Sequence, residues 1–273
     1  MHELTATVLV DNMANNALSS EWGLAIYIEY HGKKILLDTG ASGRFCANAE
    51  ALGIDLAAVD FGVLSHAHFD HSDGMEHFFR LNETAPFYLQ REAKEDCYGK
   101  KLIFRRYIGI EKGLLERRAE RIRYVDGRCE LCEGVTLLPH TTEGLAARGK
   151  AAHMVRRVAH RWVTDDFSHE QTLVFATEKG LVIFNSCSHG GVDNILQEVR
   201  HAFPGQHIHA YLGGFHLFEA PEDEVRSLAA RIRSYGVDRI VTGHCTGEKS
   251  FAVLKEELTD AEQMYGGFRF EVS

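Results

Sequence analysis

The segment His66-Ala67-His68-Phe69-Asp70-His71 constrains the fold of this chain more than any other part of its sequence. It follows directly on residues 61–64, a short apolar run that reads as a buried strand. Three imidazoles and a carboxylate so close together do not fit an apolar core, because buried polar groups without partners are costly. They are the ligands that zinc and other first-row metals prefer. The segment therefore predicts a metal site at the end of a buried strand.

The spacing within this segment favours two metal ions over one. In a turn, the alternate residues His66 and His68 converge on one ion. Asp70 and His71 then point to a second position a few Å away, as in common two-metal hydrolytic sites. We therefore expect a dinuclear centre, with zinc as the first choice of metal and manganese or iron as alternatives.

The C-terminal half repeats the order strand, histidine-bearing loop, helix three times. Strands are expected at residues 172–177, 181–185, 207–212 and 238–242, and helices at about 192–202, 222–235 and 248–258. The loops after the last three strands carry His189, His216 and His244. Because α/β folds place their active groups at the carboxyl ends of strands, we expect these histidines near the metal site.

The N-terminal part reads as strands at residues 4–10, 24–30 and 34–37, followed by a helix at about 43–52. The turn at His31-Gly32-Lys33 predicts a hairpin between the second and third strands. The third strand ends at Asp38, for which we expect a hydrogen bond to a ligand histidine that fixes its tautomer; the alternative is a turn cap.

Composition limits the class of protein. The chain has 273 residues and a formal net charge of −9, which argues against general nucleic-acid binding. It shows no signal peptide and no apolar run long enough for a membrane helix, so we expect a cytoplasmic protein with reduced cysteines and no membrane partner. Cys129 and Cys132 read as a surface turn, although the spacing also resembles half of a zinc ribbon or a redox pair.

The middle of the chain differs in charge. Residues 100–123 carry nine lysines and arginines against three glutamates. This segment, together with 148–161, is either a solvated helix face or a basic lid that attracts a small anionic substrate. We expect one domain over residues 1–273, with a partly basic insertion at about 90–170 that covers the site.

The sequence resembles the metallo-β-lactamase superfamily over most of its length. Asp38-Thr39-Gly40, the segment 65–71 and Thr242-Gly243-His244 carry this resemblance. It looks closest to the branch called dihydropterin ribofuranosyl-aminobenzene phosphate synthase-like. The narrower match lies in Glu21-Trp22-Gly23-Leu24, Cys187-Ser188-His189-Gly190-Gly191, Gly213-Gly214-Phe215-His216-Leu217 and Thr242-Gly243-His244-Cys245-Thr246-Gly247.

The resemblance implies an α/β (α+β) fold, a four-layer αββα sandwich with the site at one edge of its two sheets. It implies that His66, His68 and a third histidine bind the first metal, and that Asp70, His71 and His244 bind the second. Glu21 and Trp22 would lie in an early loop near the site. A metal-bound hydroxide would attack the substrate.

Two positions depart from the superfamily pattern. The third histidine is either His189, which the branch resemblance favours, or His140 in Pro139-His140-Thr141-Thr142-Glu143-Gly144. The bridging carboxylate of the superfamily falls near Ser186 and Cys187, where no aspartate stands; Asp193 lies in the next helix. Cys187 and Cys245 lie close in sequence to proposed ligands, but we do not predict them to bind metal.

These residues predict a metal-dependent hydrolase of a phosphate ester or phosphodiester. Asp70 and His216 are the expected catalytic residues, since either can help the leaving group depart. For His216, which follows Gly213-Gly214, the alternative is a packing role. The competing functions are a synthase in pterin metabolism on the same fold and a non-catalytic metal-binding sensor.

Overall fold

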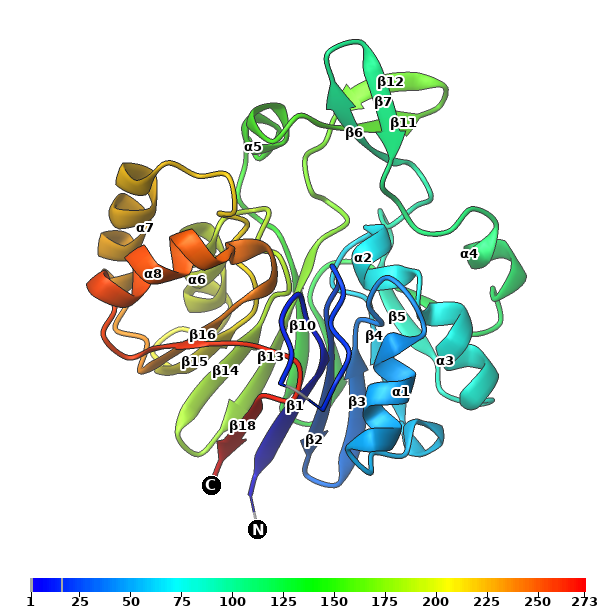
Figure 1. Cartoon of the computed structure of the whole chain (residues 1–273), viewed down its shortest axis with the longest axis horizontal. Helices are drawn as coiled ribbons and strands as arrows, with labels where there is room; N and C mark the ends of the chain where they lie inside the picture. Colours follow the sequence, from blue (N-terminus) through cyan, green and yellow to red (C-terminus); the bar gives the residue numbers. More distant parts are fainter. Residues whose placement is uncertain (1, 16) are drawn as a thin grey trace.

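Two large β-sheets lie face to face in the computed structural model, which describes residues 2–15 and 17–273 (Figure 1). The first sheet has the strand order β18-β1-β2-β3-β4-β5-β8. Its strands are β1 (Leu4–Val10), β2 (Ala25–Tyr30), β3 (Lys33–Leu37), β4 (Phe61–Val63), β5 (Phe87–Gln90), β8 (Ile122–Val125) and β18 (Arg269–Val272).

The second sheet has the order β17-β16-β15-β14-β13-β10-β9. Its strands are β9 (Cys129–Cys132), β10 (Val135–Pro139), β13 (Gln171–Thr177), β14 (Gly180–Phe184), β15 (Ile208–Leu212), β16 (Arg239–Thr242) and β17 (Ala261–Gln263). Strands β14 to β17 run parallel to one another, so that the loops after β14, β15 and β16 emerge at one edge.

Helices lie around the two sheets, most of them on the outer faces. They are α1 (Arg44–Ala51), α2 (Phe69–Ser72), α3 (Met75–Leu81), α4 (Leu114–Arg117), α5 (Ala146–Ala151), α6 (Val192–Ala202), α7 (Glu222–Ser234) and α8 (Glu248–Glu257), with short 3-10 turns at Leu56–Ala58 and His244–Thr246. The strands and helices expected from sequence on either side of the middle segment all form, with ends shifted by at most one residue.

Three layers of buried apolar residues hold this arrangement together. One lies between the sheets and includes Ile26 and Phe175, one lies under α1 and α3, and one lies under α6, α7 and α8. Burying apolar surface on both faces of each sheet is what gives the order helix, sheet, sheet, helix. The predicted αββα sandwich is therefore confirmed.

The predicted hairpin joins β2 and β3 through a two-residue turn. His31 and Gly32 have φ of 45° and 77°, and Tyr30 pairs with Lys33. Positive φ at both central residues is the mark of a type I′ turn, whose twist matches that of the flanking strands.

The middle segment, expected as one insertion over about 90–170, is divided between three sheets. Strands β8, β9 and β10 join the two main sheets. A separate four-stranded sheet has the order β12-β11-β6-β7. It consists of β6 (Cys97–Lys101), β7 (Phe104–Tyr107), β11 (Met154–Val158) and β12 (Arg161–Thr164).

This small sheet stands at the end of the molecule opposite to the two termini (Figure 1). It connects to the predicted metal loop, because Phe69 donates its backbone N–H to the Ile108 carbonyl over 2.9 Å. The interpretation of the basic segment 100–123 as one solvated helix face is wrong. Its residues form the end of β6, all of β7 and the start of β8, and α4 is the only helix within these residues.

Cys129 and Cys132 form the two ends of β9 at the edge of the second sheet, so the prediction of a surface turn is also wrong. Both side chains are half-buried against the layer between the sheets. Within residues 2–15 and 17–273, no helix is long and apolar enough to cross a membrane.

Candidate metal centre

The metal centre forms where loops from both sheets meet. The loop after β4 carries His66 and His68 and leads into α2, which carries Asp70 and His71. The loops after β14, β15 and β16 carry His189, His216 and His244. Parallel pairing within each sheet brings these strand ends to the same edge, so the six predicted ligands and His216 lie together.

The first group consists of His66, His68 and His189. One ring nitrogen from each lies within 4.8 Å of the others, and all three side chains are buried. The Nε2 atoms of His66 and His68 and both ring nitrogens of His189 have no hydrogen-bond partner in the part of the chain that the structure describes. Of the two candidates for the third histidine, the structure therefore places His189 in this group.

His140 lies outside it, held between two carboxylates. Its Nε2 is 2.6 Å from Glu170 Oε2, and its Nδ1 is 2.9 Å from Glu198 Oε2. Burial alone would lower the pKa of His140, but the two carboxylates raise it to about 9. Glu170 in turn accepts the backbone N–H groups of His189 and Gly190, each over 2.9 Å. His140 thus braces the loop that carries the third histidine.

The second group consists of Asp70, His71 and His244. Asp70 Oδ2 lies 3.7 Å from His71 Nε2 and 3.5 Å from His244 Nε2. These separations are close to those between ligands of one tetrahedral ion. The three side chains therefore surround a second position, as expected from their sequence.

Hydrogen bonds at Nδ1 direct Nε2 of three histidines toward the centre. His71 Nδ1 is 2.8 Å from Asp38 Oδ2, which confirms the expected partner of Asp38. His66 Nδ1 is 2.8 Å from Ser65 Oγ, whose own proton goes to Asp38 over 2.6 Å. Because the Ser65 hydroxyl donates to the carboxylate, it accepts from His66 Nδ1–H, and the lone pair of this ring lies on Nε2.

Asn12 has the same role for His244. Its Oδ1 lies 3.0 Å from His244 Nδ1, and its side-chain amide donates to the His244 carbonyl over 3.1 Å. Sequence reasoning missed this residue, because nothing in the Asp11-Asn12 dipeptide indicates that β1 ends beside the loop after β16.

The first group favours neutral imidazoles. Burial, followed by the neighbouring histidines, lowers the pKa of His66 and of His189 well below the usual value. Burial, followed by the nearby His169, lowers the pKa of His68 to about 3. A neutral imidazole is the form that binds metal, so this cluster needs no proton loss before it can act as a ligand set.

The residues present fit divalent metal ions. Within residues 2–15 and 17–273, five histidines around the centre have a buried ring nitrogen without a hydrogen-bond partner: His66, His68, His189, His216 and His244. A polar group buried without a partner costs free energy. A mixed set of imidazoles with a carboxylate is what zinc, manganese and ferrous iron accept. These side chains therefore leave hydrogen-bonding capacity unused among the described residues, and bound metal ions would take it up.

Three consecutive buried residues at the start of β13 brace the ligand loops, and sequence reasoning found none of them. His169 Nδ1 accepts the Ala67 N–H over 3.2 Å, Glu170 holds the loop of His189, and the Gln171 backbone N–H donates to the Ser65 carbonyl over 2.8 Å. In the sequence these three residues are only a polar run before an apolar strand. Such polar runs are common in loops and do not by themselves indicate a functional site.

His216 lies next to the first group. Its ring centroid is 4.3 Å from that of His189, and its Nδ1 is buried without a partner among the residues that the structure describes. Asp38, Ser188, His216 and His244 all have positive φ, between 48° and 60°. Such left-handed backbone is uncommon outside glycine and collects at functional sites.

Gly213 and Gly214, which precede His216, allow the backbone to approach its neighbours closely. A Cβ at Gly213 would lie 1.9 Å from the Asn185 carbonyl oxygen, and one at Gly214 would lie 2.5 Å from Cys245 Sγ. Neither contact is possible for a larger residue, so these glycines bring the end of β15 against the loops that follow β14 and β16.

Two pockets adjoin the centre. One, of about 390 Å³, is lined by His244 together with Trp22 and Phe218, whose rings meet edge to face at 5.5 Å. Trp22 is therefore beside the site, as the resemblance implied. The other, of about 360 Å³, lies beyond Phe69 and is lined by Asp73, Arg106, Tyr107, Gly109, Glu111 and Lys112.

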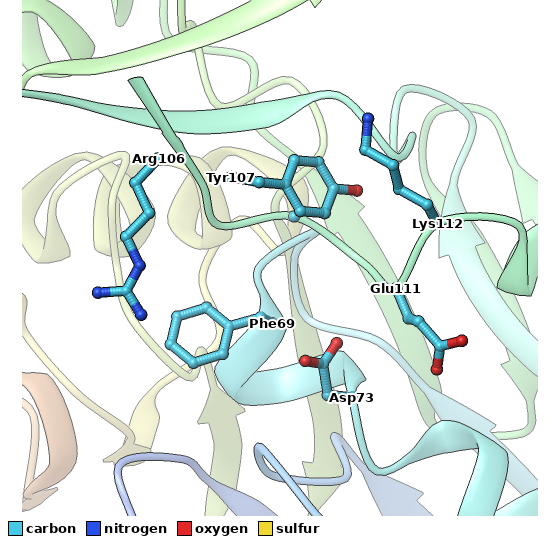
Figure 2. Close-up of a pocket in the computed structure, with 7 residues that line it drawn as sticks. Phe69, Asp73, Arg106, Tyr107, Glu111 and Lys112 are labelled. Carbon is cyan, nitrogen blue, oxygen red and sulfur yellow. The ribbon is translucent and has the colours of Figure 1, made fainter. Parts of the chain in front are cut away.

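Figure 2 shows the second pocket, with the guanidinium of Arg106 reaching down beside Phe69 and the Lys112 side chain extending away. Burial, followed by the nearby Glu111, raises the pKa of Asp73 to about 6. This pocket borders the metal loop on the side of the small sheet, and Phe69 separates it from the ligands.

Comparison with known proteins identifies the family. The family model of the metallo-β-lactamase superfamily matches residues 23–149. A crystal structure described as a metal-dependent hydrolase of the β-lactamase superfamily is 30% identical, covers 99% of both chains and superposes with a TM-score of 0.85. The chain belongs to the metallo-β-lactamase superfamily.

Other similar proteins share less. A protein of Methanocaldococcus jannaschii, named 7,8-dihydropterin-6-methyl-4-(β-D-ribofuranosyl)-aminobenzene-5′-phosphate synthase, is 28% identical over 93% of this chain and 90% of its own length. A diphosphatase of the PhnP family is 15% identical, with a TM-score of 0.55 over 98% of this chain and 96% of its own, which shows a common fold alone.

Proposed function

We propose that this protein is a dinuclear metal-dependent hydrolase of phosphate esters or phosphodiesters. The convergence of His66, His68 and His189 on one position and of Asp70, His71 and His244 on the next is the observation that carries this proposal. Divalent ions held there, zinc first and manganese or iron next, would supply positive charge for the ester and a nucleophile drawn from water at neutral pH.

The protein's own groups supply proton transfer. His216 has a buried, unpartnered Nδ1 among the described residues and lies beside His189, so we assign it the transfer of a proton to the leaving group. Asp70 faces both His71 and His244, and we assign it the orientation of the reacting water as well as metal binding.

Arg106 is the cation we assign to the anionic substrate. It lines the pocket beside Phe69 and makes no ion pair with any residue that the structure describes (Figure 2). Its guanidinium offers paired N–H donors that match phosphate oxygens. An anionic part of the substrate that extends from the metals past Phe69 would therefore meet Arg106 on the side of the small sheet.

A screen of the metal-loaded protein tests the proposal. Phosphodiesters and phosphomonoesters should be hydrolysed faster than neutral esters and lactones of similar size. Arg106→Ala should raise KM for phosphate esters about tenfold, and Lys101→Ala, on the same hairpin, should not. A fully metallated protein that hydrolyses nothing in the screen contradicts the proposal and favours the metal-binding sensor.

A synthase in pterin metabolism is the second candidate. The similarity to the M. jannaschii synthase supports it, and so does the pocket beside His244, whose Trp22 and Phe218 walls suit a flat heterocycle. A synthase joins two molecules, whereas a hydrolase needs only water. Turnover that requires a second organic substrate would favour the synthase over the hydrolase.

A further inference from the structure

Ser186 and Cys187 fall near the place where the resemblance implies a carboxylate that bridges two metals. The segment after β14 reads Asn185-Ser186-Cys187-Ser188, with no acidic side chain. Asp193, the nearest aspartate in sequence, is in α6 and pairs with Arg231 over 2.8 Å, so it does not reach the centre. The two metal positions therefore lack the usual acid between them.

The Cys187 sulfur lies between the two groups of ligands. It is within 4.8 Å of ligand atoms of His66 and His71, and also of His189 and of His244. Its distance to His71 Nε2 is 3.2 Å. His66 and His189 belong to the first metal position, and His71 and His244 belong to the second. A bridging ligand must border both metal positions, and the Cys187 side chain does so.

We propose that the Cys187 thiolate is a ligand shared by the two metal ions, in place of the bridging carboxylate. This inference rests on the metal centre of the proposed function, and it adds a ligand to the six expected from the sequence. When the ions bind, the Cys187 thiol loses its proton to solvent, and the sulfur then carries the negative charge that a carboxylate would have supplied.

A bridging thiolate has chemical consequences. Sulfur is a softer donor than a carboxylate oxygen and favours zinc over manganese. The Cys187 sulfur is buried and lies 3.2 Å from His71 Nε2, so the protein shields it from solvent. We therefore expect zinc to be preferred over manganese by a wider margin than in a centre built from nitrogen and oxygen alone.

Cys245 offers a matched control. It is equally buried and lies in a group with Cys187 and His244. Its sulfur, however, accepts the His216 backbone N–H over 3.2 Å and donates to the Cys187 carbonyl over 3.7 Å. The groups that join Cys187 to His66 and His71, and to His189, do not include Cys245. Removal of the Cys245 thiol should therefore leave the bond between Cys187 and the metals in place.

The test is the electronic spectrum of the protein loaded with cobalt in place of zinc, together with its metal content. A cobalt–thiolate bond gives an intense near-ultraviolet charge-transfer band, and imidazole or carboxylate ligands do not. The wild type and Cys245→Ser should show this band. Cys187→Ser should lose the band and bind the second ion at least tenfold more weakly. Cys187→Asp, which restores the carboxylate, should lose the band and keep two ions.

The outcomes separate this inference from the proposed function. A wild type that holds two ions and hydrolyses phosphate esters without the band would overturn the role of Cys187 and leave the hydrolase intact. A band that survives in Cys187→Ser and disappears in Cys245→Ser would assign the ligand to Cys245 and overturn the inference as well. Circular dichroism of each variant shows whether it is folded. If Cys187→Ser is unfolded, Cys187→Asp tests the same position.

Discussion

Raising the pH should weaken the brace that His140 forms with Glu170 and Glu198. The folded state holds the pKa of His140 at about 9 against an ordinary value of 6.5. Because the folded state binds the His140 proton more tightly than the unfolded state, this proton stabilises the fold. The stabilisation is complete below pH 6.5 and is lost as the pH rises through about 9. Each tenfold change in proton affinity is worth about 1.4 kcal/mol, so the whole effect is about 3 kcal/mol.

His140→Gln isolates this contribution. The amide keeps hydrogen-bonding capacity between the two carboxylates but carries no charge. We expect the variant to be about 3 kcal/mol less stable than the wild type near pH 6 and nearly equal to it above pH 10. Burial of the pair makes the loss larger than for surface ion pairs, which contribute roughly 0–1 kcal/mol.

Urea unfolding of metal-free protein, followed by circular dichroism from pH 6 to 10, measures the difference between the two proteins at each pH. His160→Gln, a change at an exposed histidine, is the control and should give a difference near zero throughout. A difference between wild type and His140→Gln that does not change with pH would refute the reasoning, because it would mean that His140 is neutral in the folded protein.

Three further predictions concern the centre itself. His68→Ala and His244→Ala should each lower bound metal and abolish hydrolysis, measured by elemental analysis and an ester assay; full activity in either variant contradicts the two-metal site. Asn12→Ala frees the His244 ring and should weaken binding of one ion about 10–100-fold in a chelator competition, whereas unchanged affinity would remove Asn12 from the site. His216→Ala should keep both ions and lose rate by about 100-fold or more, and loss of metal instead would make His216 a ligand.

Local pattern was enough to predict most of the ligand set. The segment His66 to His71 places four polar side chains directly after an apolar strand, and burying them in an apolar core without partners would be costly. The strands and helices after residue 170 followed from hydrophobic periodicity, and the loops of His189, His216 and His244 followed from them. These features depend on neighbours in the chain, which a sequence displays directly.

The small sheet shows where local pattern was insufficient. Residues 100–123 are rich in long cationic side chains, which suit an exposed helix and an exposed hairpin equally. Strand β6 pairs with β11, where Met154 lies opposite Gly99, and pairing over such a distance along the chain leaves no local mark. The charge was therefore visible from the sequence, but the strands that carry it were not.

The sequence by itself determined the fold class, the six-residue ligand segment and the absence of an acid between Asn185 and Ser188. Tertiary structure decided between His189 and His140, because only the spatial positions of Glu170 and Glu198 show that His140 is already engaged. It also placed Asn12 against His244 and Cys187 between the two groups of ligands. The physical reason is the same in each case: ligand type is a property of a residue, whereas the direction of a lone pair depends on contacts between distant parts of the chain.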